Sequence, residues 1–550
     1  MNRETNARFE LAPQVGIERS TFRMDTNVKT SFNVGDCIPF FCMEVLPGDT
    51  FDINTAKVMR LQTLLTPVMD NLYLDVYYFF VPNRLVWKHW QNFCGENTDT
   101  YWTPSVEYTV PKVTAPSGGW NVGTIADYLG IPTGVSNIKV NALPFRAYAL
   151  IMNQWFRDEN LTTPLYIDDG DTNRTGSNSS GTNYVYLGGQ PFKAAKFHDY
   201  FTSALPEPQR GPDVTIPLGT IAPVVTGDKM ATSMIVGKNP MMFAMTYNGN
   251  QVVNRFIGTD SGGQAISNYD NNDEAFNPDG ADGVMPSNLY ANLENATGAT
   301  INQLRLAISI QRAYEIDARS GTRYIEILRS HFGVVSPDAR LQRAEYLGGN
   351  RFPLNIEQVT QTSSTDSVSP IGTVAGWSQT ADYSSDVFKS FVEHGFIIGI
   401  CVARYDHTYQ QGLECMWSRS TRFDYYWPVF AHIGEKAVYN KELYAQGTSA
   451  DDEVFGYQEA WAEYRYKPNY VTGQMRSQYA QSLDIWHFAD DYSSQPYLSD
   501  SWIREDATNI DRTLAVPSST ADQIFGDILV EVKATRPMPL YSIPGIGTHL

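Results

Sequence analysis

The sequence has few of the features that mark exported, membrane-spanning or zinc-binding proteins. Its first residues, MNRETNARFELAPQ, contain no apolar stretch of the kind that a signal peptide needs. The longest clean apolar run, Phe396–Ala403, is far too short to span a bilayer. The 5 cysteines form no CxxC pair. We therefore expect a chain without membrane insertion, with reduced thiols and with no zinc site.

Common catalytic motifs are also missing. The patterns GxSxG, HExxH, GxxxxGK[ST] and a strand-linked GxGxxG do not occur. The run Asp260–Gly263 matches the nucleophile loop of chymotrypsin-like proteases, but neither upstream histidine, His89 or His198, lies in a matching motif. We predict no catalytic residue, no cofactor and no enzyme activity.

One acidic loop imitates a calcium site. Asp169, Asp171 and Asn173 have the spacing of the start of an EF-hand loop. Arg174 stands in place of the required glycine, and Ser180 stands in place of the closing glutamate. We therefore predict no metal site here.

The charge balance limits the partners. The 550 residues carry 41 Lys and Arg against 60 Asp and Glu, a net charge of -19. Such an acidic chain cannot wrap nucleic acid by bulk electrostatics, so any contact with DNA must be local.

The densest apolar segment is Leu72–Phe80. Alternate residues place Leu72, Leu74, Val76, Tyr78 and Phe80 on one face of a strand and Tyr73, Asp75, Tyr77 and Phe79 on the other. Because both faces are apolar, this strand needs a layer of protein on each side. Aromatic residues make up 13% of the chain, and 41 Gly with 30 Pro imply many turns, so the pattern favours an all-β sandwich.

Other segments complete this outline. The run from Phe391 is a second apolar strand and a natural partner of the first, and residues 528–533 alternate as a half-exposed strand. Helical spacing appears in Leu143–Asn160 and in Thr300–Phe332, the latter interrupted at Gly321.

Composition divides the chain into three parts. Residues 1–30 lack periodicity and are expected to form an N-terminal arm over a neighbouring subunit. Residues 31–222 and 299–550 form the core, with loops between subunits that include the polar stretch Gln361–Ser385. Residues 223–298, rich in Asn, Gly, Asp and Ser, indicate a surface-exposed insertion.

The best local pattern for nucleic acid consists of interleaved basic and aromatic residues. It comprises Tyr464, Arg465, Tyr466, Lys467 and Arg476. Such residues stack unpaired bases and hold phosphates. In a strand, however, the two tyrosines would face away from Arg465 and Lys467, which favours a structural use over a joint platform.

Several motifs, in one order along the chain, resemble the major capsid protein of the gokushovirus group of microviruses. They are VLPGDTF from Val45, PVMDNLYLDVYYFFVPNRLVWKHWQNFCGE from Pro67, TIADYLGIPTGV from Thr124, NALPFRAYALIMNQWFRDENL from Asn141, EYLGG from Glu345, EAWAEYRYKPNYVTGQMR from Glu459 and the closing PLYSIPGIGTHL. The matches cover much of the chain, with departures at Ile17–Ser20, Asp25–Asn27 and Met152.

The resemblance implies a more specific structure and function than composition does. The expected fold is an eight-stranded antiparallel jelly-roll barrel with long loop insertions and a few helices. The expected function is a major capsid protein that builds a small icosahedral, T=1 shell around a single-stranded DNA genome, assembled in the bacterial cytoplasm. The expected partners are copies of itself, the DNA on the inner face and a small basic DNA-binding virion protein.

By this resemblance, the insertion at 223–298 corresponds to a surface protrusion at the threefold axes. Its exposure would allow contact with a host surface receptor. Composition fits equally well a variable loop that binds no receptor. Two other readings of the whole chain stay open. One is a carbohydrate-active β-sandwich enzyme, which would show paired carboxylates across a cleft. The other is a non-capsid binding protein such as a phage attachment lectin, which would form a trimer or a monomer instead of a shell.

Overall fold

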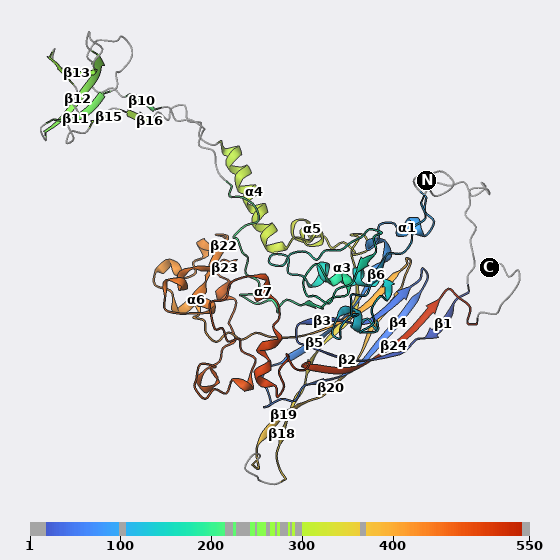
Figure 1. The fold of residues 1–550 in the computed structure, drawn as a ribbon. Coiled ribbons are helices and arrows are strands. Elements are labelled where there is room, and N and C mark those ends of the chain that lie inside the picture. The colour runs from blue at the N-terminus through green and yellow to red at the C-terminus, as the bar shows by residue number, and fades with distance from the viewer. Residues whose placement is uncertain are drawn as a thin grey trace. The chain divides into compact units, whose positions relative to one another are not determined.

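The computed structural model divides the chain into two compact units (Figure 1). The first comprises Met1–Arg210 and Glu315–Leu550, and the second comprises Gly211–Tyr314. The structure describes residues 18–97, 106–214, 300–363 and 370–541, together with short strands between residues 224 and 291. The predicted insertion, 223–298, falls inside the second unit, and its boundaries stay a prediction.

One sheet of the first unit is organised around the last strand of the chain. Its strands are all antiparallel, and in order across the sheet they are β1 (Ser20–Arg23) and β2 (Thr26–Phe32), β24 (Ile524–Arg536), β4 (Thr50–Leu61) and β20 (Thr380–Ser390). Strands β1 and β2 pair with successive parts of the same edge of β24. The described part of the predicted arm thus joins a sheet of its own chain.

The second sheet carries the apolar strand found in the sequence. In order, its strands are β17 (Glu345–Leu354), β5 (Leu72–Pro82), β21 (Gly395–Tyr405), β3 (Asp36–Val45) and the short β9 (Phe192–Lys193). Leu72 of β5 lies opposite Tyr405 of β21, and Pro82 lies opposite Gly395. The predicted pairing of the two apolar segments is confirmed.

Side chains from both sheets fill a common core. Leu72, Leu74, Val76, Tyr78 and Phe80 of β5 meet Ile53 of β4 and Val530 and Val532 of β24 there. The opposite face of β5 contributes Phe79 and Val81 to a second core. Both faces of β5 are therefore covered, as the sequence predicts.

Helices and loops cover the outer face of the second sheet. The helices are α1 (Trp90–Phe93), α2 (Ile125–Tyr128) and α3 (Leu143–Ile151), which continues as a π-helical turn over Met152–Phe156. The predicted helix at 143–160 is thus confirmed in type, although it ends four residues early. Tyr148 is fully buried and donates a hydrogen bond of 2.6 Å to the carbonyl of Cys37, which fixes α3 to β3.

The remaining elements of the first unit are short. They are β6 (Lys112–Thr114), β7 (Lys139–Asn141), β8 (Arg174–Thr175), α5 (Tyr324–Phe332), β18 (Ile356–Thr360), β19 (Val374–Ser378), β22 (Glu435–Tyr439), α6 (Asn440–Leu443), β23 (Val454–Glu459) and α7 (Asp500–Ile503). Helix α4 (Ile301–Ser320) precedes Gly321, whose φ of 95° lies in the region that favours glycine. The predicted helical break at Gly321 is therefore confirmed.

The described strands of the second unit form two antiparallel sheets. The larger has the order β14, β13, β12, β11, β15, and the smaller pairs β10 with β16. Their bounds are β10 (Val224–Thr226), β11 (Met242–Tyr247), β12 (Asn250–Thr259), β13 (Ala265–Tyr269), β14 (Asn272–Ala275), β15 (Val284–Pro286) and β16 (Leu289–Ala291). The protease-like run Asp260–Gly263 lies outside the described residues.

Overall, the chain is mostly β-sheet with few helices, as expected. The hydrogen-bond ladders of the two large sheets do not join into a closed barrel among the described strands. The prediction of a loop over Gln361–Ser385 is wrong in part, because β19 and half of β20 lie there. These strands keep one face in solvent and contain many Ser and Thr residues. They have too few apolar residues to show the alternation that predicts a strand from sequence.

A core truncation tests the role of β5. Leu74 has no exposed surface, so Leu74→Ala should lower the free energy of unfolding by about 2–5 kcal/mol. Leu65 is 47% exposed, so the matched change Leu65→Ala should cost less than about 0.5 kcal/mol. Urea unfolding of the dissociated chain measures both. Equal losses for the two variants would contradict the assignment of Leu74 to the central core.

Candidate nucleic-acid interface

The predicted basic and aromatic segment is not a strand. It begins in a 3₁₀ turn at Ala462–Tyr464, runs as a loop to Tyr470, and reaches a second 3₁₀ turn at Gly473–Met475. The alternation of faces expected for a strand therefore does not apply. Aromatic and basic side chains of this segment can meet on one surface.

Four of the five predicted residues line one cavity of about 760 Å³. They are Tyr464, Tyr466, Lys467 and Arg476. Arg465 is absent from its lining and instead pairs with Glu459, at 2.9 Å. The structure thus brings most of the predicted site together.

Aromatic rings dominate the wall of this cavity. Tyr466 stacks on Tyr200 with ring centroids 5.3 Å apart and planes 11° from parallel. The Arg419 guanidinium lies 4.2 Å from the ring centroid of Tyr464. Trp417 and Tyr470, which also line the cavity, are 70% and 63% exposed. Exposed flat rings of this kind can stack on unpaired bases.

The basic groups, in contrast, are already engaged. Lys467 lies 2.5 Å from Glu414, and Arg419 lies 3.5 Å from Glu463. Arg476 donates a hydrogen bond of 2.7 Å to the carbonyl of Gln410. A phosphate would have to compete with these partners, so the site is better suited to stacking than to strong charge attraction.

Sequence reasoning missed the other wall of the cavity. Trp417 and Arg419 come from the segment after β21, and Tyr200 comes from the loop after β9. The run CMWSRSTRFDYYWPVF from Cys415 interleaves aromatic and basic residues just as the segment at Tyr464 does. The same signal could have found it.

A buried ion cluster anchors the chain that leads from β21 into the cavity. His407 donates to Asp490 and to Glu505, each at 3.0 Å, and all three side chains are buried. Gln410 then holds Ser477 through hydrogen bonds of 2.9 and 3.0 Å. These contacts tie both walls of the cavity to the end of the second sheet.

The two carboxylates keep His407 charged. Burial alone would lower the pKa of His407, but the charges and hydrogen bonds of Asp490 and Glu505 raise it to about 9. Burial alone would likewise raise the pKa of Asp490, but His407 and Lys196 hold it well below its usual range. His407 and Asp490 are therefore both charged at neutral pH.

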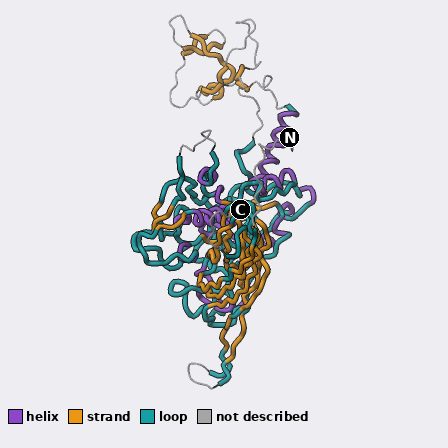
Figure 2. The backbone as a smooth tube through the Cα atoms, turned by 90° about the vertical axis from the view of Figure 1, so that its right-hand side faces the viewer, coloured by secondary structure: helices purple, strands orange, loops and turns teal. Residues whose placement is uncertain are grey.

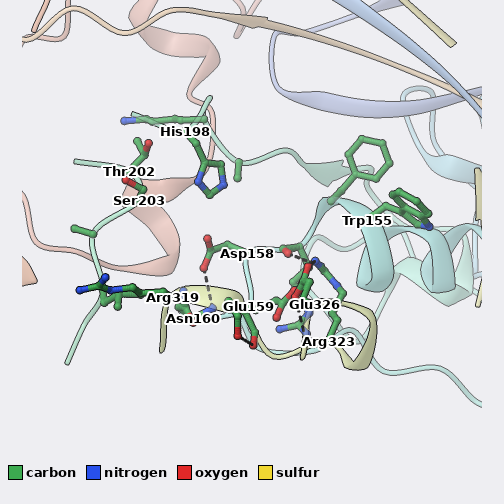
Figure 3. A pocket seen from close by; sticks show the side chains of 18 of the residues that line it. Trp155, Asp158, Glu159, Asn160, His198, Thr202, Ser203, Arg319, Arg323 and Glu326 are labelled. Carbon is green, nitrogen blue, oxygen red and sulfur yellow. Dashed lines mark hydrogen bonds and ion pairs between the residues drawn. The ribbon is translucent and has the colours of Figure 1, made fainter. Parts of the chain in front are cut away.

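A second cavity, of about 790 Å³, lies beside the start of α5 (Figure 3). It is lined by charges of both signs, among them Arg319, Arg323, Glu159 and Glu326. Arg323 pairs with both glutamates, and Glu159 also accepts hydrogen bonds from Thr322. His198 also lines this cavity, on a segment apart from these charges.

The paired glutamates have opposite pKa shifts. Burial and the neighbouring Glu159 raise the pKa of Glu326, whereas hydrogen bonds from Thr322 and the Arg323 charge outweigh burial and lower the pKa of Glu159. Both carboxyl groups pair with the same guanidinium, that of Arg323. Glycosidases instead place two carboxyl groups on either side of a sugar bond, so this pair does not support the carbohydrate-active reading.

The acidic side chains of the calcium-like loop pair with other side chains of the same chain. Asp168 pairs with Arg174 at 2.6 Å. Asp171 accepts hydrogen bonds from Trp87 at 2.7 Å and from His89 at 2.9 Å. In the part of the chain that the structure describes, no group of three or more His, Cys, Asp or Glu side chains could hold a metal ion.

Comparison with known proteins shows to which family the chain belongs. The family model described as "Capsid protein (F protein)", a phage family, matches residues 12–546. The chain belongs to this phage capsid protein family.

Three curated relatives, all named capsid protein VP1, match this capsid protein over nearly its whole length. The relative from Spiroplasma virus 4 is 44% identical over 535 residues, covering 96% of each chain. That from Bdellovibrio phage phiMH2K is 43% identical over 545 residues, covering 99% of this chain and 98% of the relative. That from Chlamydia phage 1 is 39% identical over 595 residues, covering 98% and 97%.

These matches confirm the resemblance to gokushovirus-type microviruses and support a major capsid protein. Membership of a structural family favours a non-enzymatic role and a place in the virion. None of the helices within the described residues combines the length and the apolar character needed to cross a bilayer.

The ion cluster at His407 predicts a pH dependence. Because its pKa is raised above about 6.5, the stabilisation is fully present below that pH and is lost as pH rises through about 9. His407→Gln should lower the unfolding free energy by about 3–5 kcal/mol at pH 7, since two buried carboxylates lose their partner. Urea unfolding should find a smaller difference between variant and wild type at pH 10. A difference that is equal at both pH values would contradict the assignment.

Proposed function

We propose that this capsid protein is the subunit of a small icosahedral shell that encloses a single-stranded DNA phage genome and assembles in the bacterial cytoplasm. The match to the capsid family over residues 12–546 carries this proposal. The names of the three relatives support it, because each is the capsid protein of a virus or phage.

We infer further that eight strands of the two large sheets of the first unit form a jelly roll. Numbered in chain order from one to eight, these strands are β2, β3, β4, β5, β17, β20, β21 and β24. Across the first sheet their order is one, eight, three, six, and across the second it is two, seven, four, five. This interleaving of two four-stranded sheets is what two successive Greek keys produce, which supports the jelly-roll assignment. Strands β1 and β9 are additions at the edges.

Electron cryomicroscopy of native particles tests both parts of the proposal. We expect a closed icosahedral shell of this chain and a density that follows the eight strands in the stated order. A particle of other symmetry, or a different order of strands, would contradict it.

The insertion at 223–298 is proposed as the surface that contacts a host receptor. Its polar composition supports an exposed position. In sequence it lies between β5 and β17, the fourth and fifth strands of the proposed jelly roll, so it is added without dividing a strand. Exchanging this segment with that of a relative should change which host the particles adsorb to, and unchanged adsorption would refute the role.

We also propose that the cavity around Tyr464 and Tyr466 contacts the genome on the inner face of the shell. The exposed rings of Trp417 and Tyr470 support stacking on unpaired bases. Because Lys467 and Arg465 are paired within the chain, the contact adds little positive charge. A small basic virion protein would then supply most of the neutralising charge for the DNA, which fits the net charge of -19.

A tyrosine substitution tests the DNA contact. Tyr470→Ala should weaken binding of a single-stranded oligonucleotide by about tenfold, because one stacked base is worth about 1–3 kcal/mol. Tyr497, 66% exposed and outside this cavity, provides the matched control Tyr497→Ala, which should bind as wild type does. Fluorescence titration at several salt concentrations measures both. Equal affinities for Tyr470→Ala and wild type would remove this site from the proposal.

A further inference from the structure

A two-stranded ribbon extends beyond both large sheets of the first unit. It consists of β18 and β19, which pair in register from Ile356 opposite Ser378 to Thr360 opposite Val374. The ribbon connects β17 of one sheet with β20 of the other, and Figures 1 and 2 both show it projecting from the end of the sandwich. A lone two-stranded hairpin of this length is marginally stable in water, so other contacts must stabilise the ribbon.

One face of the ribbon is fixed to its own chain. Gly376 forms a bridge with Leu64, and a Cβ atom at Gly376 would lie 2.5 Å from the carbonyl oxygen of Thr66. The backbone of Asn355 donates a hydrogen bond of 2.7 Å to Thr380. The root and the orientation of the ribbon are therefore defined.

The other face carries Val359, Ala375 and Trp377 together with Glu357, and all four residues are exposed. Val359 lies opposite Ala375, and Trp377 lies opposite Glu357. Val359 is 51% exposed and Trp377 is 46% exposed. Among the described strands, β18 pairs with β19 alone, so its outer edge also presents backbone donors and acceptors. Apolar faces and open edges of this kind are typical of contact surfaces.

The charge of the ribbon indicates what covers it. Within 355–363 and 370–379, Glu357 is the single ionisable residue. Residues 355–379 contain no Lys or Arg, which argues against DNA. Their two carboxylates, Glu357 and Asp366, give a basic protein little to bind. Copies of a chain with net charge -19 repel one another, so they must meet where charge is low. The ribbon meets this requirement.

We propose that the ribbon face formed by Val359, Ala375 and Trp377 docks on a second copy of the chain. The inference rests on the proposed shell and identifies one contact that holds neighbouring subunits together. Trp377 has the small and apolar Ala375 and Val359 beside it and a single carboxylate, Glu357, opposite it. Aromatic residues of this kind are enriched at the centre of interfaces between proteins.

A pair of valine substitutions tests this contact in the full chain during phage assembly. Val359→Asp should reduce the yield of shells by about tenfold, while the thermal midpoint of the dissociated chain stays unchanged. Val122 is 78% exposed and lies outside the ribbon, so Val122→Asp adds the same charge and should assemble as wild type does. A normal yield of shells from Val359→Asp would overturn the proposal.

Photo-cross-linking identifies the partner directly in assembled particles. A benzoylphenylalanine in place of Trp377 is introduced into particles assembled from a mixture of light and isotopically heavy chains. Mass spectrometry should find cross-links between light and heavy copies. Cross-links to DNA, to another virion protein, or within one copy alone would overturn the proposal. If wild-type chains form no shell at all, the proposed function itself fails, which is a distinct result.

Discussion

Burial of β5 on both faces is the constraint on which the rest of the first unit depends. One face packs in the core shared with the other sheet, and the opposite face packs against α3 and the loops around it. A strand in this position can carry almost no charge. Its one carboxylate, Asp75, is compensated by two arginines, Arg351 from β17 and Arg404 from β21. The sheet is thus a rigid layer with other elements fixed to each side.

The candidate DNA contact and the ribbon differ in how they are attached to this layer. The cavity around Tyr464 is built from loops, and it is held through the buried ions at His407, just beyond the end of β21. The ribbon continues directly from β17 and β20, and it is held by close backbone packing at Gly376. Stacking on bases tolerates the adaptable surface of loops. A contact between subunits benefits from a rigid one.

The sequence predicts the apolar elements well because burial leaves a periodic pattern. The two faces of β5, its pairing with β21 and the helix at α3 follow from that pattern. The ribbon and β20 could not be predicted, because their Ser, Thr and Gly residues carry no strong periodicity. The cavity was predicted in part, because the alternation of basic and aromatic residues near Tyr464 shows which side chains could contact nucleic acid. It does not show that Arg465 turns away to Glu459, or that Tyr466 stacks on Tyr200 from a distant loop. Those contacts depend on the tertiary fold.

We propose that an acidic chain, of net charge -19, forms a closed container for DNA. Its copies must then meet through surfaces of low charge, and the genome must be neutralised mainly by another component. The most direct measurement is the mass and the nuclease-protected DNA content of native particles, determined together by sedimentation and digestion. We expect a megadalton shell, built mainly of this chain, that shields single-stranded DNA. A small oligomer that protects no DNA would contradict it.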